Sequence, residues 1–63
     1  MKKKQYVIRD LTTQAYFYAI EILGTYVFYT KKKEEAPRYD ENRVFKMMDV
    51  LRKRGARVIH EAV

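Results

Sequence analysis

A single amphipathic helix pattern limits most strongly what this chain can fold into. It starts after Asp40, which suits an N-cap, and ends at Gly55, which suits the position after the last helical turn. Its apolar residues recur at the spacing i, i+3, i+4, i+7, and they are Val44, Met47, Met48 and Leu51. A helix of about 14 residues spans roughly 20 Å, which covers one face of a small sheet and not both.

The other apolar residues alternate as they do in β-strands. We expect strands at residues 5–9, 15–22, 25–30 and 57–61, with Gly24 at the second turn and one helical turn at residues 33–36. This order predicts an α+β fold, β-β-β-α-β, in which one helix packs on one face of an antiparallel sheet of three or four strands. The 63 residues allow one domain, residues 1–63, with residues 1–4 as a flexible basic tail.

The strands carry large apolar residues on both faces, although the helix pattern can cover only one. Strict alternation places Tyr16, Tyr18 and Ile20 on one face and Phe17 on the other. We therefore expect an open aromatic face, with these partner-binding residues: Tyr16, Tyr18, Ile20 and Tyr26.

The expected partner of this face is a host or phage protein, and a second copy of the chain is the other candidate. Arg57 and Glu61 are charges of the kind that protect a sheet edge from pairing. For self-association, we therefore expect contact between faces rather than pairing along the last strand.

The formal net charge of +6 suggests nucleic-acid binding as the alternative function. Beyond the three lysines near the start of the chain, the basic residues that would contact phosphates are Lys31, Lys32, Lys33, Arg52, Lys53 and Arg54. Solvation, protection of a sheet edge and the helix dipole explain the same residues without nucleic acid. In a three-stranded meander, the lysines near the start of the chain and the lysines at residues 31–33 lie at opposite ends of the sheet. We therefore rank nucleic-acid binding second, after protein binding.

The composition argues against catalysis and against metal binding by this chain. It has neither Cys nor Ser, and its only histidine, His60, has no recognisable nucleophile or metal ligand beside it. We therefore expect no catalytic residue, no metal and no cofactor. The basic start is not followed by an apolar stretch, and residues 15–29 are too polar to span a membrane, so the expected location is the cytoplasm of the host cell.

Four short segments carry a family resemblance, and together they reach across most of the chain. They are Tyr6-Val7-Ile8-Arg9-Asp10, Tyr29-Thr30, Glu35-Ala36-Pro37-Arg38-Tyr39-Asp40 and Gly55-Ala56-Arg57-Val58. In this order they resemble very small phage and prophage proteins of unassigned function. The chain departs from that pattern at Thr13-Gln14, where a hairpin glycine is usual, and at Pro37. The resemblance implies the fold and an origin in a mobile element, and it implies no activity.

Overall fold

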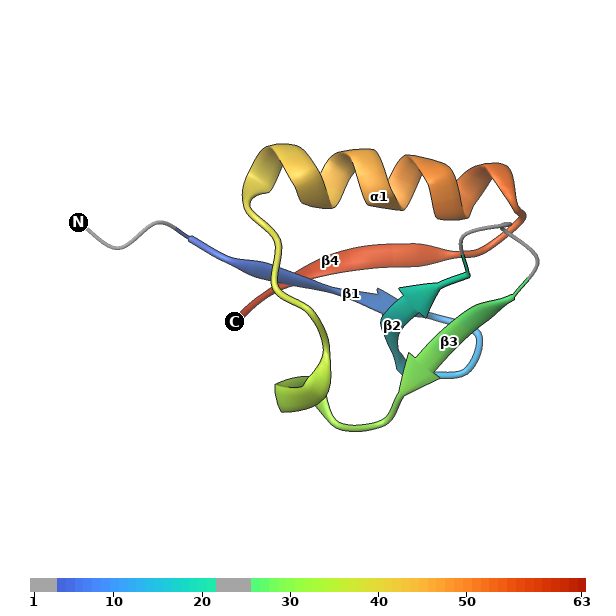
Figure 1. Cartoon of the computed structure of the whole chain (residues 1–63), viewed down its shortest axis with the longest axis horizontal. Helices are drawn as coiled ribbons and strands as arrows, with labels where there is room; N and C mark the ends of the chain where they lie inside the picture. Colours follow the sequence, from blue (N-terminus) through green and yellow to red (C-terminus); the bar gives the residue numbers. More distant parts are fainter. Residues whose placement is uncertain (1–3, 22–25) are drawn as a thin grey trace.

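The structure, a computed structural model that describes residues 4–21 and 26–63, has the predicted element order β-β-β-α-β (Figure 1). The elements are β1 (Tyr6–Asp10), β2 (Tyr16–Ile20), β3 (Val27–Thr30), the 3₁₀ turn η1 (Lys33–Glu35), α1 (Glu41–Lys53) and β4 (Val58–Ala62). The prediction of a helical turn at residues 33–36 is confirmed. Residues 1–3 of the predicted basic tail at residues 1–4, and the predicted turn at Gly24, lie outside the described residues.

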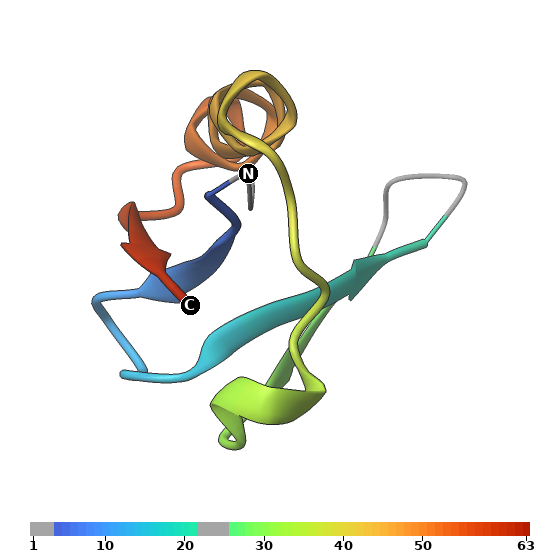
Figure 2. The same cartoon turned by 90° about the vertical axis from the view of Figure 1, so that its left-hand side faces the viewer.

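The four strands form one antiparallel sheet in the order β3-β2-β1-β4. The last strand pairs along its whole length with the first, from Tyr6 opposite Ala62 to Asp10 opposite Val58. The chain therefore leaves β3 at one edge of the sheet and returns through α1 to the other edge. This arrangement places the helix over β1 and β4, and the β2–β3 hairpin extends away from it (Figure 2).

The helix forms where the sequence predicts it. The backbone N–H of Arg43 donates to Oδ1 of Asp40 at 2.8 Å, which confirms Asp40 as the N-cap, and Gly55 has the positive φ of +88° expected after the last turn. Three residues of the predicted stripe are buried, and Met47 packs beside them. The cluster they form with the sheet consists of Val44, Met48, Leu51, Ile8, Phe17 and Val58.

The turn between β1 and β2 depends on Asp10, a buried carboxylate. Its Oδ2 accepts hydrogen bonds from the backbone N–H and the hydroxyl of Thr13, both at 2.9 Å. Gln14 then takes a positive φ of 62°, a conformation that costs a side-chain-bearing residue more than glycine. Hydrogen bonds from Gln14 to Leu11 and from Arg9 to Gln14 hold the turn.

A bulge in β2 overturns the prediction that Tyr16, Tyr18 and Ile20 share one face. Phe17 pairs with Tyr29, but the next pair is Ala19 with Phe28, so Tyr18 is an extra residue in the strand. Alternation restarts after it, and Ile20 pairs with Val27 on the helix side, where both pack against the core cluster. Ile20 is therefore partly buried against the core, whereas Tyr16 stays on the opposite face.

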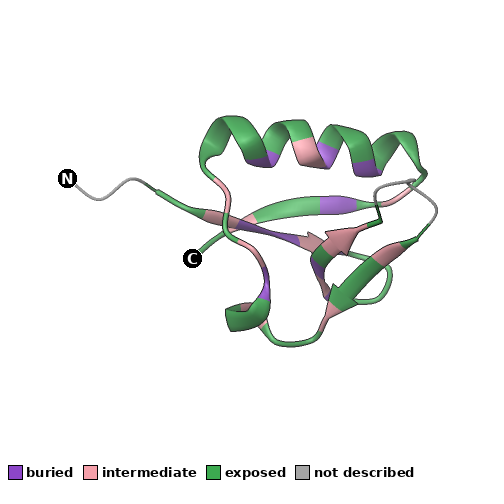
Figure 3. Cartoon of the chain, in the orientation of Figure 1, coloured by how far each residue is buried: buried purple, intermediate pink, exposed green. Residues whose placement is uncertain are grey.

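The face away from the helix is closed over the start of β1, which corrects the expectation of one wholly uncovered face. Val7 points away from the helix and is nevertheless fully buried. The segment that follows η1 runs beside the start of β1, where Tyr39 and Tyr6 exchange backbone hydrogen bonds of 2.8 and 2.9 Å. Figure 3 shows the result, with buried positions under the helix and along β1, and exposed or intermediate positions on β3.

Candidate interaction surface

Three aromatic side chains project from the hairpin on the side away from the helix. Tyr18, Tyr26 and Phe28 are 52%, 64% and 53% exposed. Tyr26 and Phe28 alternate with Val27, which points to the core, and Tyr18 is the bulge residue next to the Ala19–Phe28 pair. We call these three residues the hairpin face.

The structure therefore separates the four residues predicted to bind a partner. Tyr18 and Tyr26 belong to the hairpin face, Tyr16 lies half-buried at its inner border, and Ile20 lies partly buried against the core on the helix side. Phe28 was missing from the predicted set. The alternation of side chains along residues 26–30 places Phe28 on the same face as Tyr26, and this pattern is visible in the sequence.

Tyr16 is held at the border by a network centred on Glu61 of β4. The Glu61 carboxylate accepts from the Tyr16 hydroxyl at 3.1 Å and forms ion pairs with Lys33 at 3.0 Å and Arg9 at 3.5 Å. Hydrogen bonding from Lys33, then from Tyr16, and the charge of Arg9 lower the pKa of Glu61, although burial opposes the shift. The network joins β1, β2, β4 and η1, so the base of the hairpin is fixed to the rest of the fold.

A groove of about 490 Å³, open to solvent, lies beside the hairpin face and is lined by Tyr18, Tyr29, Thr30 and Glu35. The Thr30 hydroxyl donates to Oε2 of Glu35 at 3.0 Å. Burial and, to a smaller extent, the charge of Asp10 raise the pKa of Tyr29. Its phenol is therefore neutral at pH 7 and can donate a hydrogen bond. The groove adds polar groups to the border of an apolar surface.

The basic residues of the nucleic-acid alternative do not form one patch. Lys31, Lys32 and Lys33 lie at η1, and the other cluster lies at the far end of α1 (Figure 1). Four of the six also have partners within the protein. Lys33 binds Glu61, Lys32 lies 3.9 Å from Glu35, Lys53 lies 3.2 Å from Asp49, and Arg52 donates to the carbonyl of Val58 at 3.2 Å.

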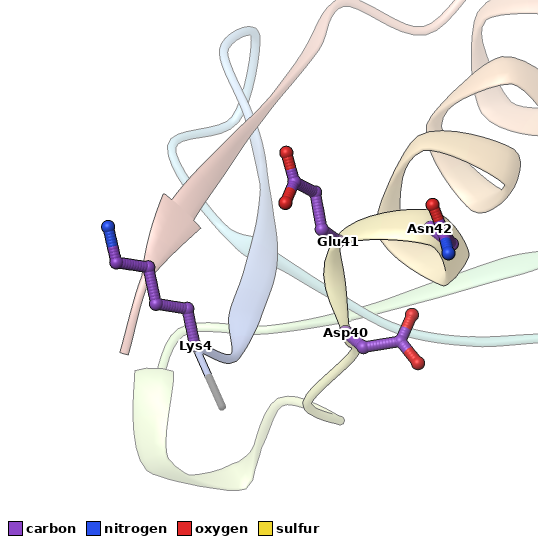
Figure 4. Close-up of a pocket in the computed structure, with 4 residues that line it drawn as sticks. All are labelled: Lys4, Asp40, Glu41 and Asn42. Atoms are coloured by element: carbon purple, nitrogen blue, oxygen red, sulfur yellow. The ribbon is translucent and has the colours of Figure 1, made fainter. Parts of the chain in front are cut away.

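A further hollow of about 370 Å³ lies at the start of α1 and is lined by Lys4, Asp40, Glu41 and Asn42. Figure 4 shows that the carboxylates of Asp40 and Glu41 point in different directions. Asp40 already accepts the hydrogen bond that caps the helix. Its role is therefore structural.

His60 also has a structural explanation. Its ring packs edge-on against Tyr6, with centroids 5.2 Å apart, and against Phe45, with centroids 5.1 Å apart. The described residues contain no group of three or more His, Cys, Asp or Glu side chains that could hold a metal ion. Within the same part of the chain, no helix is both long and apolar enough to cross a membrane.

Comparison of the chain with family models, with curated proteins and with solved structures finds no match. Functional inference therefore depends on the geometry of the hairpin and on the sequence.

Proposed function

We propose that this protein acts by binding another protein through the hairpin face, without catalysing a reaction. The partner is a host protein or a phage protein, whose activity the contact modulates. The resemblance to small phage and prophage proteins supports a mobile-element origin for the chain.

The observation that carries the proposal is the exposure of three aromatic side chains on one short hairpin. Aromatic side chains bury roughly 150–250 Å² each, so the exposed halves of these three offer on the order of 300 Å². Burial of that area is worth about 7 kcal/mol before the costs of association are subtracted. Aromatic residues with a polar tip are also the type enriched at the centres of protein interfaces.

The charge of the chain indicates what kind of protein partner fits. The formal net charge is +6, and no ion pair joins Lys31, Arg38 or Arg54 to another described residue. A partner with an acidic surface around an apolar centre would meet the hairpin face faster, because opposite charges steer the encounter. The apolar centre would then set the lifetime of the complex.

Affinity capture tests the proposal, with the intact chain as bait in a lysate of the source bacterium. The test variant is the double substitution Tyr26→Ala/Phe28→Ala, and the matched control is Phe45→Ala, which removes a 46% exposed aromatic side chain from the helix. We expect a protein that is retained by the parent and by the control and is lost with the double variant. Circular dichroism first establishes that all three baits are folded.

Retention of the same protein by the double variant at parental levels would exclude the hairpin face as the contact. Recovery of nucleic acid in place of a specific protein would favour the alternative function.

A further inference from the structure

The two edges of the sheet differ in whether their outward backbone groups already form hydrogen bonds within the protein. At the two ends of β4, Leu11 N–H donates to the Arg57 carbonyl and Val63 N–H donates to the Gln5 carbonyl. The backbone groups of Arg57 and Val63 therefore face β1. By alternation, Val58, His60 and Ala62 direct their backbone carbonyls outward. Arg52 from α1 donates to the Val58 carbonyl at 3.2 Å, and Lys33 from η1 donates to the Ala62 carbonyl at 3.0 Å. Two cationic side chains therefore block the β4 edge.

The β3 edge is open. Glu21 N–H donates to the Tyr26 carbonyl at 3.0 Å, so Tyr26 faces β2, and by alternation the backbone groups of Val27 and Tyr29 point outward. Among the described residues, no hydrogen bond reaches these outward groups. Residues 26–30 also carry no charged residue and no proline, which are two of the features that protect natural edge strands.

We infer that the β3 edge pairs with β3 of a second copy of this chain, antiparallel and about a two-fold axis at Phe28. A two-fold axis that relates antiparallel strands is perpendicular to the sheet, so paired residues must lie on the same face in both copies. The register centred on Phe28 meets this condition. It also places the outward groups of Val27 opposite those of Tyr29 in the second copy, so that each such pair can exchange both backbone hydrogen bonds.

The side chains suit this register. Phe28 lies opposite Phe28 of the second copy, and Val27 lies opposite Tyr29. Aromatic pairs and aromatic–β-branched pairs are the cross-strand combinations that stabilise antiparallel sheets, each by a few tenths to about 1 kcal/mol.

The charge of the chain does not oppose the pairing. Because the strands are antiparallel, Lys31 of one copy lies six positions along the strand from Lys31 of the other, which is roughly 20 Å at 3.4 Å per residue. This distance is more than twice the Debye length of about 8 Å at physiological ionic strength. Repulsion between the two lysine clusters is therefore largely screened.

This inference goes beyond the proposed function, because it depends on the outward backbone groups of β3 together with only one residue of the hairpin face, Phe28. It has a consequence for that surface. The axis is perpendicular to the sheet, so both helices lie on one side of the joined sheet and both hairpin faces lie on the other. A dimer thus presents two copies of the surface side by side.

Charge substitutions at Phe28, which would face its own counterpart, give the test. Sedimentation equilibrium is measured for the parent, for Phe28→Lys, for Phe28→Glu and for an equimolar mixture of the two variants. We expect twice the chain mass of 7.7 kDa for the parent and for the mixture, and the single-chain mass for each variant alone. The control Phe45→Lys, on the helix, should remain dimeric.

Three results would overturn the inference. A parent mass of 7.7 kDa at all concentrations would exclude the dimer, and the β3 edge could then pair only with an extended segment of another protein. Variants that each remain dimeric would exclude a register centred on Phe28, and variants that stay single in the mixture would exclude direct contact at that position. If either variant fails to fold, hydrogen exchange of the parent decides, because the amides of Val27 and Tyr29 must become more protected as concentration rises.

Discussion

Replacing Met48 with aspartate should unfold this protein. Met48 is buried in the cluster that joins α1 to β1, β2 and β4. Removing a buried methionine side chain costs about 2–5 kcal/mol, and an unpaired carboxyl group in the same place costs about 1–3 kcal/mol more. A chain of 63 residues has about 3–9 kcal/mol of stability in total, at about 0.05–0.15 kcal/mol per residue. The expected loss is therefore comparable to the whole stability.

Two matched variants separate burial from other effects of the substitution. Val50→Asp places the same charge on the same helix, at a side chain that is 43% exposed, and should change the stability by about 1 kcal/mol or less. Met48→Leu keeps the volume and the apolar character and should cost less than about 1.5 kcal/mol.

Far-ultraviolet circular dichroism with urea titration measures all three variants. We expect no cooperative transition for Met48→Asp, and transitions near the parental midpoint for Val50→Asp and Met48→Leu. If Met48→Asp unfolds cooperatively near the parental midpoint, Met48 does not face the sheet and the placement of the helix is wrong.

Three further predictions follow from the capping residue, the carboxylate network and the basic charge. Asp40→Ala should remove the helix cap and cost about 1 kcal/mol in urea denaturation, and an unchanged midpoint would argue against the cap. The pKa of Glu61 in the folded protein lies below its ordinary value of 4.5, so its contribution to stability is present above that pH and is lost as the pH falls through the lowered pKa. Thermal melts from pH 6 to pH 2 should therefore show a shallower acid decline for Glu61→Gln than for the parent, and parallel curves would show that the network is not stabilising. For the nucleic-acid alternative, binding of single-stranded DNA should be weak at physiological salt, and Tyr18→Ala should leave it unchanged; tight binding that falls steeply with salt and is weakened by Tyr18→Ala would reverse the order of the two functions.

The sequence alone was sufficient for features that depend on neighbouring residues. The spacing of Val44, Met48 and Leu51, the cap at Asp40 and the positive φ at Gly55 are all local, because helix periodicity and capping act within one or two turns. The four strands and the fold class also followed from alternation and turn residues. The exposure of Tyr26 follows from the same local pattern.

The tertiary structure decided features that depend on contacts between distant segments. The bulge at Tyr18 turns Ile20 toward the core, and a register shift of this kind depends on how β2 meets β3 rather than on the residues of β2 alone. Likewise, Glu61 meets Lys33 and Tyr16 only because β4 returns to pair with β1, across about fifty residues of chain. That return also leaves β3 as an open edge. Pairing partners are chosen by the packing of the whole domain, and no local pattern records them.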